Sequence, residues 1–194
     1  MNPCDVELLE LSKKSLDVKN PIFGEVGTWC GRSALMMGKW LLRRDGDFYA
    51  IDHFRGSMND PKDQKTANRI MVRDIYFRNI SLMPNIHTLA MTSIDAARIF
   101  KDEMFDLFFI DGDHRYAAVQ ADIEMWLPKV KKGGIFCGHD CKCHADKVDP
   151  KILRIEDISQ YRKSGVFPGV VRAVCERFDK EQLHINRGIW WIQK

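Results

Sequence analysis

Apolar residues along the chain fall into short continuous runs that alternate with longer stretches of helical spacing. Runs without polar alternation are typical of strands buried on both faces of a parallel sheet. Five such strands are predicted, at residues 21–26 ("PIFGEV"), 47–52 ("DFYAID"), 85–91 ("NIHTLAM"), 105–113 ("FDLFFIDGD") and 133–140 ("GGIFCGHD").

Helical spacing separates these strands, and an N-terminal helical segment over residues 1–20 precedes them. At the end of the chain, "QLHIN" and "GIWWIQ" flank an "RG" turn, which predicts an antiparallel hairpin. Alternating strands and helices favour a doubly wound α/β fold. We therefore predict one Rossmann-like domain over residues 1–194: a mostly parallel seven-stranded sheet with a C-terminal antiparallel hairpin and helices on both faces. The predicted helices are residues 32–44, 65–80, 94–101, 116–130 and 169–180.

One long segment does not follow this alternation. Residues 141–166 are polar and irregular, and they exceed the usual length of a connection in a compact domain. This segment is predicted to be a lid or an acceptor-binding loop.

Composition excludes several classes of protein. The net charge of +3, from 30 basic and 27 acidic residues, gives no electrostatic signal for nucleic acid or membrane as a partner. Acidic residues interrupt the N-terminal apolar positions, unlike a signal peptide, and no apolar run approaches the roughly 20 residues of a membrane helix. The six cysteines are therefore expected to be free thiols in a cytoplasmic protein.

The first strand ends in "GEVGTWCGRS", a turn rich in ligand-binding features. Gly27 and Gly31 would allow a ligand close to the backbone, beside the free N–H groups of the next helix. The carboxylate of Glu25 would repel a pyrophosphate but attract an ammonium group. Asp52, ending the second strand, could bind ribose hydroxyls. Together these features indicate a nucleoside joined to an amino acid.

The stretches "GEVGTWCGRSALMM" and "FIDGDHRYAAVQADIEMWLPKVKKGGIFCGHD" resemble class I S-adenosylmethionine-dependent methyltransferases. The similarity is greatest to metal-dependent O-methyltransferases of the catechol and caffeoyl-CoA type and to bacterial sugar and macrolide O-methyltransferases. It covers roughly residues 21–140 and implies S-adenosylmethionine as cofactor and a small-molecule hydroxyl, of a sugar or a phenol, as acceptor. The cofactor-binding residues that it implies are Glu25, Gly27, Thr28, Trp29, Gly31, Ser33, Asp52, His53, Ser93, Asp111 and His114.

The same resemblance implies a divalent metal held by Asp111, His139 and Asp140. Mg²⁺ is the first expectation, with Mn²⁺ and Zn²⁺ as alternatives, because His139 departs from the oxygen ligands that Mg²⁺ prefers. The attacking hydroxyl must also lose a proton, and His114 is the first candidate for the general base, with Asp113 as the second. Each of these residues has a plainer interpretation: Asp113 as a helix cap, His114 as a helix-start residue, and His139 as a core histidine.

Two other functions stay open. A metal-dependent enzyme of the cephalosporin-hydroxylase-like type could share this fold and metal pair, because fold does not fix reaction. A non-catalytic module could instead bind a nucleoside, or a metal through the cysteines and histidines of "CGHDCKCH". The sequence also leaves homo-oligomerisation open.

Overall fold

The computed structural model describes residues 3–14, 17–57, 61–156 and 165–194. Seven strands form one sheet in the order β3-β2-β1-β4-β5-β7-β6. The first five in this order are parallel, β7 is antiparallel to β5, and β6 is antiparallel to β7. The prediction of a mostly parallel seven-stranded sheet is therefore confirmed. The strands are β1 (Ile22–Val26), β2 (Asp47–Ile51), β3 (Ile86–Leu89), β4 (Phe105–Ile110), β5 (Val130–Gly138), β6 (His184–Asn186) and β7 (Ile189–Gln193).

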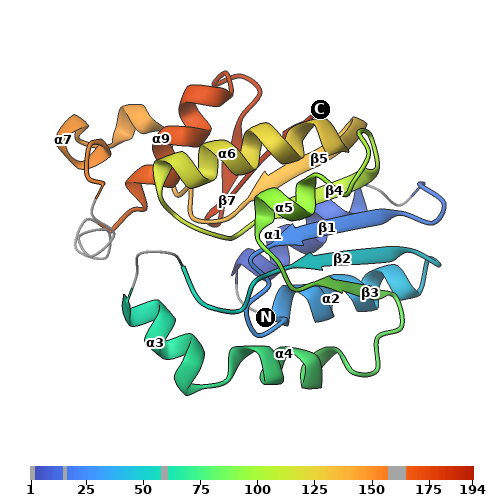
Figure 1. The fold of residues 1–194 in the computed structure, drawn as a ribbon. Helices are drawn as coiled ribbons and strands as arrows, with labels where there is room; N and C mark the ends of the chain where they lie inside the picture. The colour runs from blue at the N-terminus through green and yellow to red at the C-terminus, as the bar shows by residue number, and fades with distance from the viewer. Residues whose placement is uncertain (1–2, 15–16, 58–60, 157–164) are drawn as a thin grey trace.

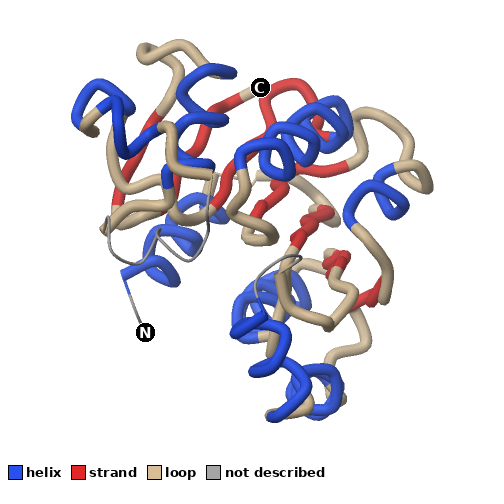
Figure 2. Tube along the Cα trace, turned by 60° about the vertical axis from the view of Figure 1, so that its left-hand side comes forward, coloured by secondary structure: helices blue, strands red, loops and turns tan. Residues whose placement is uncertain are grey.

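Helices cover both faces of the sheet, as predicted (Figures 1 and 2). Buried side chains of α5 (Ser93–Ala97), α6 (Tyr116–Trp126) and α9 (Pro168–Arg177) form the core on one face. Those of α1 (Pro3–Lys13), α2 (Arg32–Leu42) and α4 (Val72–Ile80) form the core on the other. None of the helices in the described ranges is long and apolar enough to cross a membrane.

The predicted helix at residues 65–80 was wrong in one respect, because the chain forms two helices there. The first, α3 (Pro61–Arg69), is separated from α4 by Met71, whose φ is 51°. The sequence of α3 is almost wholly polar, whereas α4 buries Val72, Tyr76 and Ile80 at helical spacing against the sheet. The first half of the predicted helix buries Ala67, whereas the second half has a continuous apolar face, and the chain turns where that face begins.

Other boundaries differ by a few residues. The helix predicted at 116–130 gives way at Leu127 to a 3₁₀ turn, η1 (Leu127–Lys129), and β5 begins earlier than expected. The segment 141–166 contains two short helices, η2 (Ala145–Lys147) and α7 (Pro150–Leu153), while residues 157–164 lie outside the described part. Its role as a lid stays a prediction.

The C-terminal hairpin is confirmed, and its turn has an identifiable geometry. Arg187 and Gly188 both have positive φ, 52° and 83°. Two such residues match the right-handed twist of the flanking strands in a two-residue hairpin loop. The hairpin pairs with β5 through β7, which brings the turn to the carboxyl end of β5.

Strand β4 anchors the centre of the sheet. All six of its residues are buried, and Phe108 stacks on Trp126 of α6 with ring centroids 4.2 Å apart. Gly24 on neighbouring β1 leaves room for this packing, since a Cβ there would lie 2.5 Å from the Phe108 ring. The residues that follow β4 therefore emerge from a rigid support.

Candidate functional site

The carboxyl ends of the central parallel strands meet at one edge of the sheet, where β1 and β4 flank the reversal of strand order. Backbone hydrogen bonds hold the exit loops together beyond the strands. The Asp111 amide donates to Val26 at 2.8 Å, and the His139 amide donates to Ile110 at 2.9 Å. Side chains that were predicted from separate motifs are thereby brought to one place.

The glycine turn after β1 is built for close backbone approach. Gly27 has φ of 86°, and a Cβ there would lie 2.0 Å from the carbonyl oxygen of Asp111. Gly31, with φ of 78°, begins α2 directly against the ring of Tyr76. Glycine is required at both positions, for backbone conformation and for space.

A cavity opens between this turn, α1 and β7. Several predicted cofactor residues line it, and α1 adds residues that the sequence did not indicate. Its lining is Cys4, Asp5, Leu8, Gly27, Thr28, Trp29, Cys30, Arg32, Ser33, Phe109, Asp111, His139 and Ile189.

Glu25 is fully buried at the end of β1. One carboxylate oxygen accepts a hydrogen bond from the Ser33 hydroxyl, while the other, Oε2, has no partner among the described residues. Burial raises the pKa of Glu25 to about 8. Glu25 itself does not line the cavity, but its hydrogen-bond partner Ser33 does. A cationic group that reached the unpartnered oxygen would restore its lost solvation.

Asp52 lies at the end of β2 and binds two neighbouring loops. Its carboxylate accepts from the amide of Trp29 at 2.8 Å and from the amide of Phe54 at 2.7 Å. Both partners have positive φ, so Asp52 stabilises two strained turns as well as facing the ligand side of the sheet. His53 beside it accepts from the Arg55 amide at 3.1 Å. Ribose binding by Asp52 stays a prediction.

Ser93 begins α5, beyond the carboxyl end of β3. Its hydroxyl donates to Asp122 and accepts from the indole N–H of Trp126 at 2.8 Å. Asp122 is buried in α6, and burial raises its pKa to about 7. Asp122 was not predicted as a site residue, although its sequence carries a signal: an acid at helical spacing with Val119 and Trp126 on the apolar face of a helix.

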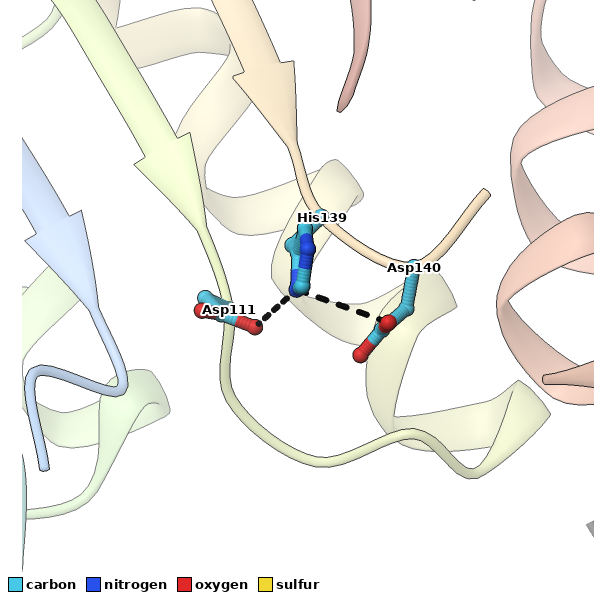
Figure 3. A group of neighbouring side chains, drawn as sticks. All are labelled: Asp111, His139 and Asp140. Atoms are coloured by element: carbon cyan, nitrogen blue, oxygen red, sulfur yellow. Dashed lines mark ion pairs between the residues drawn. The ribbon is translucent and has the colours of Figure 1, made fainter. Parts of the chain in front are cut away.

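Asp111, His139 and Asp140 form a cluster whose side chains are close enough together to hold a metal ion (Figure 3). One ligand atom from each lies within 4.8 Å of the others, and no other such group occurs in the described part of the chain. His139 Nδ1 is 3.4 Å from Asp111 Oδ1 and 3.4 Å from Asp140 Oδ1. Asp140 has φ of 62°, a left-handed conformation that turns the chain just past β5.

The three groups are electrostatically coupled. Burial alone would lower the pKa of His139, but the carboxylates of Asp111 and Asp140 raise it to about 11. Burial alone would raise the pKa of Asp140, but hydrogen bonds from His114 and His139 hold it well below its usual range. Burial raises the pKa of Asp111. The negative charge of these carboxylates is therefore balanced by protonated His139, and a bound cation would take the place of that proton.

The cysteines of "CGHDCKCH" do not join this cluster. Cys137 is buried within β5 and contacts the carbonyl of Phe108, and Cys141 is also buried and contacts the carbonyl of Cys143. All six cysteines are free, as predicted. Among the residues that the structure describes, the loop forms no group of three such side chains close enough to hold a metal, so the hypothesis of a metal site built from it gains no support.

His114 and Asp113 differ in how free each is to accept a proton. His114 Nε2 lies 2.8 Å from Asp140 Oδ2, and its ring stacks on Phe167 with centroids 4.5 Å apart. Both carboxylate oxygens of Asp113 accept hydrogen bonds from the guanidinium of Arg115. A carboxylate held by an arginine is a poor proton acceptor, so the geometry favours His114 over Asp113. Phe167 had no sequence signal, because it follows an irregular segment.

The comparison with protein families gives a match over most of this region. A family model described as "Methyltransferase domain" matches residues 25–141, more than half of the chain. The match begins at Glu25 and ends directly after Asp140, so it contains the cofactor-side turn and all three residues of the metal-type cluster.

Similar folds occur among solved structures. CalS11, a TDP-rhamnose 3'-O-methyltransferase of calicheamicin biosynthesis, has a TM-score of 0.63 at 13% identity, over 97% of this chain and 77% of that one. A candidate caffeoyl-CoA O-methyltransferase from Staphylococcus aureus has a TM-score of 0.62 at 14% identity, over 100% and 85% of the chains. The SAH-bound methyltransferase PaMTH1 from Podospora anserina has a TM-score of 0.58 at 13% identity, over 95% and 77%.

Proposed function

Since this chain belongs to the methyltransferase-domain family, we propose that it transfers a methyl group from S-adenosylmethionine to a hydroxyl of a small molecule, assisted by a divalent cation. The observation that carries this proposal is the juxtaposition of two features at one edge of the sheet. Glu25, which leads into the glycine turn, has an unpartnered buried oxygen among the described residues. Asp111 both lines the cavity at that turn and belongs to the metal-type cluster.

The cavity residues fit the proposed cofactor. When bound, S-adenosylmethionine supplies an electrophilic methyl group on a sulfonium. Glu25 would bind its ammonium group, because burial leaves Oε2 without a hydrogen bond within the described residues. Gly27 and Trp29 line the cavity together with Ser33, the hydrogen-bond partner of Glu25. Asp52 would bind the ribose, since it follows β2 on the same edge of the sheet.

The metal-type cluster also fits its proposed ligand. Two carboxylates and one imidazole nitrogen are the donors expected for a divalent ion. Asp111, His139 and Asp140 would hold it, and it would acidify and orient the acceptor hydroxyl. Because Asp111 lines the cavity proposed for the cofactor as well, an acceptor bound at the cluster would lie beside the methyl donor.

His114 is proposed to remove the proton from the acceptor hydroxyl. The hydrogen bond to Asp140 would fix its ring with Nε2–H toward the carboxylate, leaving the Nδ1 lone pair to accept a proton. Stacking on Phe167 limits rotation of the ring. Sugars and phenols are the acceptors to screen first, since CalS11 is named for a rhamnose derivative and the Staphylococcus aureus protein for caffeoyl-CoA.

The experiment begins with calorimetric titration of S-adenosylmethionine into metal-stripped protein, repeated with Mg²⁺, Mn²⁺ and Zn²⁺. Micromolar binding is expected, followed by formation of S-adenosylhomocysteine when hydroxyl acceptors are screened. The test variant is Asp140→Asn, because Asp140 belongs to the cluster but does not line the cavity. It should lower turnover by roughly 10² to 10⁴-fold while cofactor affinity changes only a few-fold.

The outcomes separate the competing functions. Failure of the cofactor to bind under any metal condition would exclude methyl transfer and favour the hydroxylase-like enzyme or the binding module. Cofactor binding with full turnover by Asp140→Asn would exclude a catalytic metal but retain the methyltransferase. Cofactor and metal binding without turnover on any hydroxyl acceptor would favour the non-catalytic module.

A further inference from the structure

Three segments that are distant in sequence converge on His139. Cys4, in the first turn of α1, places its Sγ 3.0 Å from His139 Nε2. The same sulfur donates to the backbone carbonyl of Arg187 at 3.1 Å. Gly188 follows in the hairpin turn, and a Cβ there would lie 3.7 Å from His139 Nε2 and 3.8 Å from Cys4 Sγ.

The proton positions at this contact follow from the number of hydrogens available. A thiol has one hydrogen, and the carbonyl oxygen of Arg187 can only accept. If the Cys4 hydrogen points to Arg187, the contact between Cys4 and His139 requires Nε2–H as the donor and sulfur as the acceptor. In the neutral imidazole the lone pair is then on Nδ1.

Nδ1 is the atom that faces the two carboxylates, at 3.4 Å from each. A lone pair directed at two negative oxygens is unfavourable unless a cation lies between them. Either a second proton on His139 or a metal ion would satisfy this arrangement. When a metal displaces that second proton, the contact with Cys4 would keep the remaining hydrogen on Nε2 and leave Nδ1 as the nitrogen that binds the metal.

We infer that Cys4 is a positioning residue for His139, and that it makes the cluster a mixed nitrogen and oxygen site selective for Mn²⁺ or Zn²⁺ over Mg²⁺. This inference rests on the metal site of the proposed function. Hydrogen bonds to the second nitrogen of a metal-binding histidine fix its tautomer and orientation, and their loss typically weakens metal affinity about 10 to 100-fold. The affinity for Mg²⁺ should increase least when the His139 nitrogen is positioned in this way, because Mg²⁺ prefers oxygen ligands.

Helix α1 is also held in place without Cys4, which supplies a control. Glu7 accepts a hydrogen bond from Asn186 Nδ2 at 2.7 Å and lies 3.7 Å from the guanidinium of Arg187. Glu7→Gln should therefore weaken the attachment of α1 to the hairpin without removing either side chain of the contact between Cys4 and His139. It separates a loss of helix docking from a loss of the sulfur contact.

The experiment measures Mn²⁺ and Mg²⁺ affinity by calorimetry for the full chain and for Cys4→Ala, Cys4→Ser and Glu7→Gln. We expect tighter binding of Mn²⁺ than of Mg²⁺ by the unaltered chain. Cys4→Ala should weaken Mn²⁺ binding about 10 to 100-fold and Mg²⁺ binding less. Cys4→Ser should lose less Mn²⁺ affinity than Cys4→Ala, because the serine hydroxyl can also donate and accept a hydrogen bond. The Mn²⁺ affinity of Glu7→Gln should stay within about twofold of that of the unaltered chain.

A second readout reports the tautomer directly. In the zinc-loaded protein labelled with ¹⁵N-histidine, His139 should show a protonated Nε2 and a metal-bound Nδ1, assigned by comparison with His139→Gln. A protonated Nδ1 would overturn the inference, as would unchanged Mn²⁺ affinity in Cys4→Ala. The protein loaded with Co²⁺ gives a third test. An intense near-ultraviolet sulfur-to-cobalt band that Cys4→Ala abolishes would overturn the inference too, because Cys4 would then be a metal ligand.

Failure of this inference and failure of the proposed function give different results. If the unaltered chain binds S-adenosylmethionine but no divalent ion, the metal part of the proposed function fails, and the role of Cys4 with it. If it binds Mn²⁺ with the same affinity whether or not Cys4 is present, the metal site stands and only the positioning role is excluded.

Discussion

Replacing Glu25 by glutamine should remove a stability penalty and, with it, the anchor for the cofactor. Glu25 is fully buried, and one of its oxygens has no partner within the described residues. A glutamine side chain would keep the shape and could still accept from Ser33. It could not carry a negative charge, so the variant isolates the electrostatic part of the role.

The expected size follows from the pKa of Glu25, which burial raises from 4.5 to about 8. At pH values between these two pKa values, Glu25 is ionised in the unfolded chain but still protonated in the folded chain. Unfolding therefore releases a proton, and rising pH favours the unfolded state. For the protein without cofactor, this one group should lower the free energy of unfolding by about 3 to 4 kcal/mol between pH 5 and pH 8, approaching about 5 kcal/mol at higher pH.

The assay is urea unfolding of the metal-free and cofactor-free protein at several pH values from 5 to 8. Other groups titrate in both proteins, so the informative quantity is the difference in unfolding free energy between Glu25→Gln and the unaltered chain. This difference should increasingly favour the variant as pH rises. Added S-adenosylmethionine should stabilise only the unaltered chain. A difference that does not change with pH would refute a buried, protonated Glu25.

Two further predictions concern the base and the glycine turn. His114→Gln should lower kcat by about 10² to 10⁴-fold at saturating cofactor and metal, whereas Asp113→Asn should lower it less than about tenfold. Equal losses of kcat for the two variants in steady-state assays would contradict the assignment of His114 rather than Asp113 as the base. Gly27→Ala should lower the free energy of unfolding by about 3 kcal/mol or more, because its Cβ would overlap the Asp111 carbonyl. Gly133→Ala, at φ of 77° with nothing within 4 Å, is the matched control and should lose only about 1 kcal/mol in the same denaturation series.

The fold could be predicted because its strands have an unambiguous pattern. The six buried residues of β4 are apolar apart from Asp106, and such runs occur only where both faces of a sheet are covered. The resemblance to class I methyltransferases is confirmed by the family match, which spans the two motifs on which it was based. The break at Met71 was missed, because it depends on which half of a helix finds a surface to cover.

Part of the candidate site could be predicted for a related reason. Glu25, Asp111 and Asp140 each lie at or just beyond the carboxyl end of a parallel strand. In such a sheet these ends share one edge, so residues far apart in the chain can be expected near one another once the strands are known. The roles of these residues in binding and catalysis stay predictions.

The same reasoning cannot reach the partners supplied by the covering layers. Cys4 and His139 are separated by 135 positions, and their contact depends on how α1 packs across the sheet and against the hairpin. The apolar spacing of Leu8 and Leu11 indicates which face of α1 is buried, but not how far the helix extends toward the strand ends. The end of β5 fixes where the His139 ring lies, whereas the packing of α1 fixes which nitrogen of that ring is directed at Asp111 and Asp140. The choice of metal at this site would therefore depend on the part of the structure that local sequence patterns describe least.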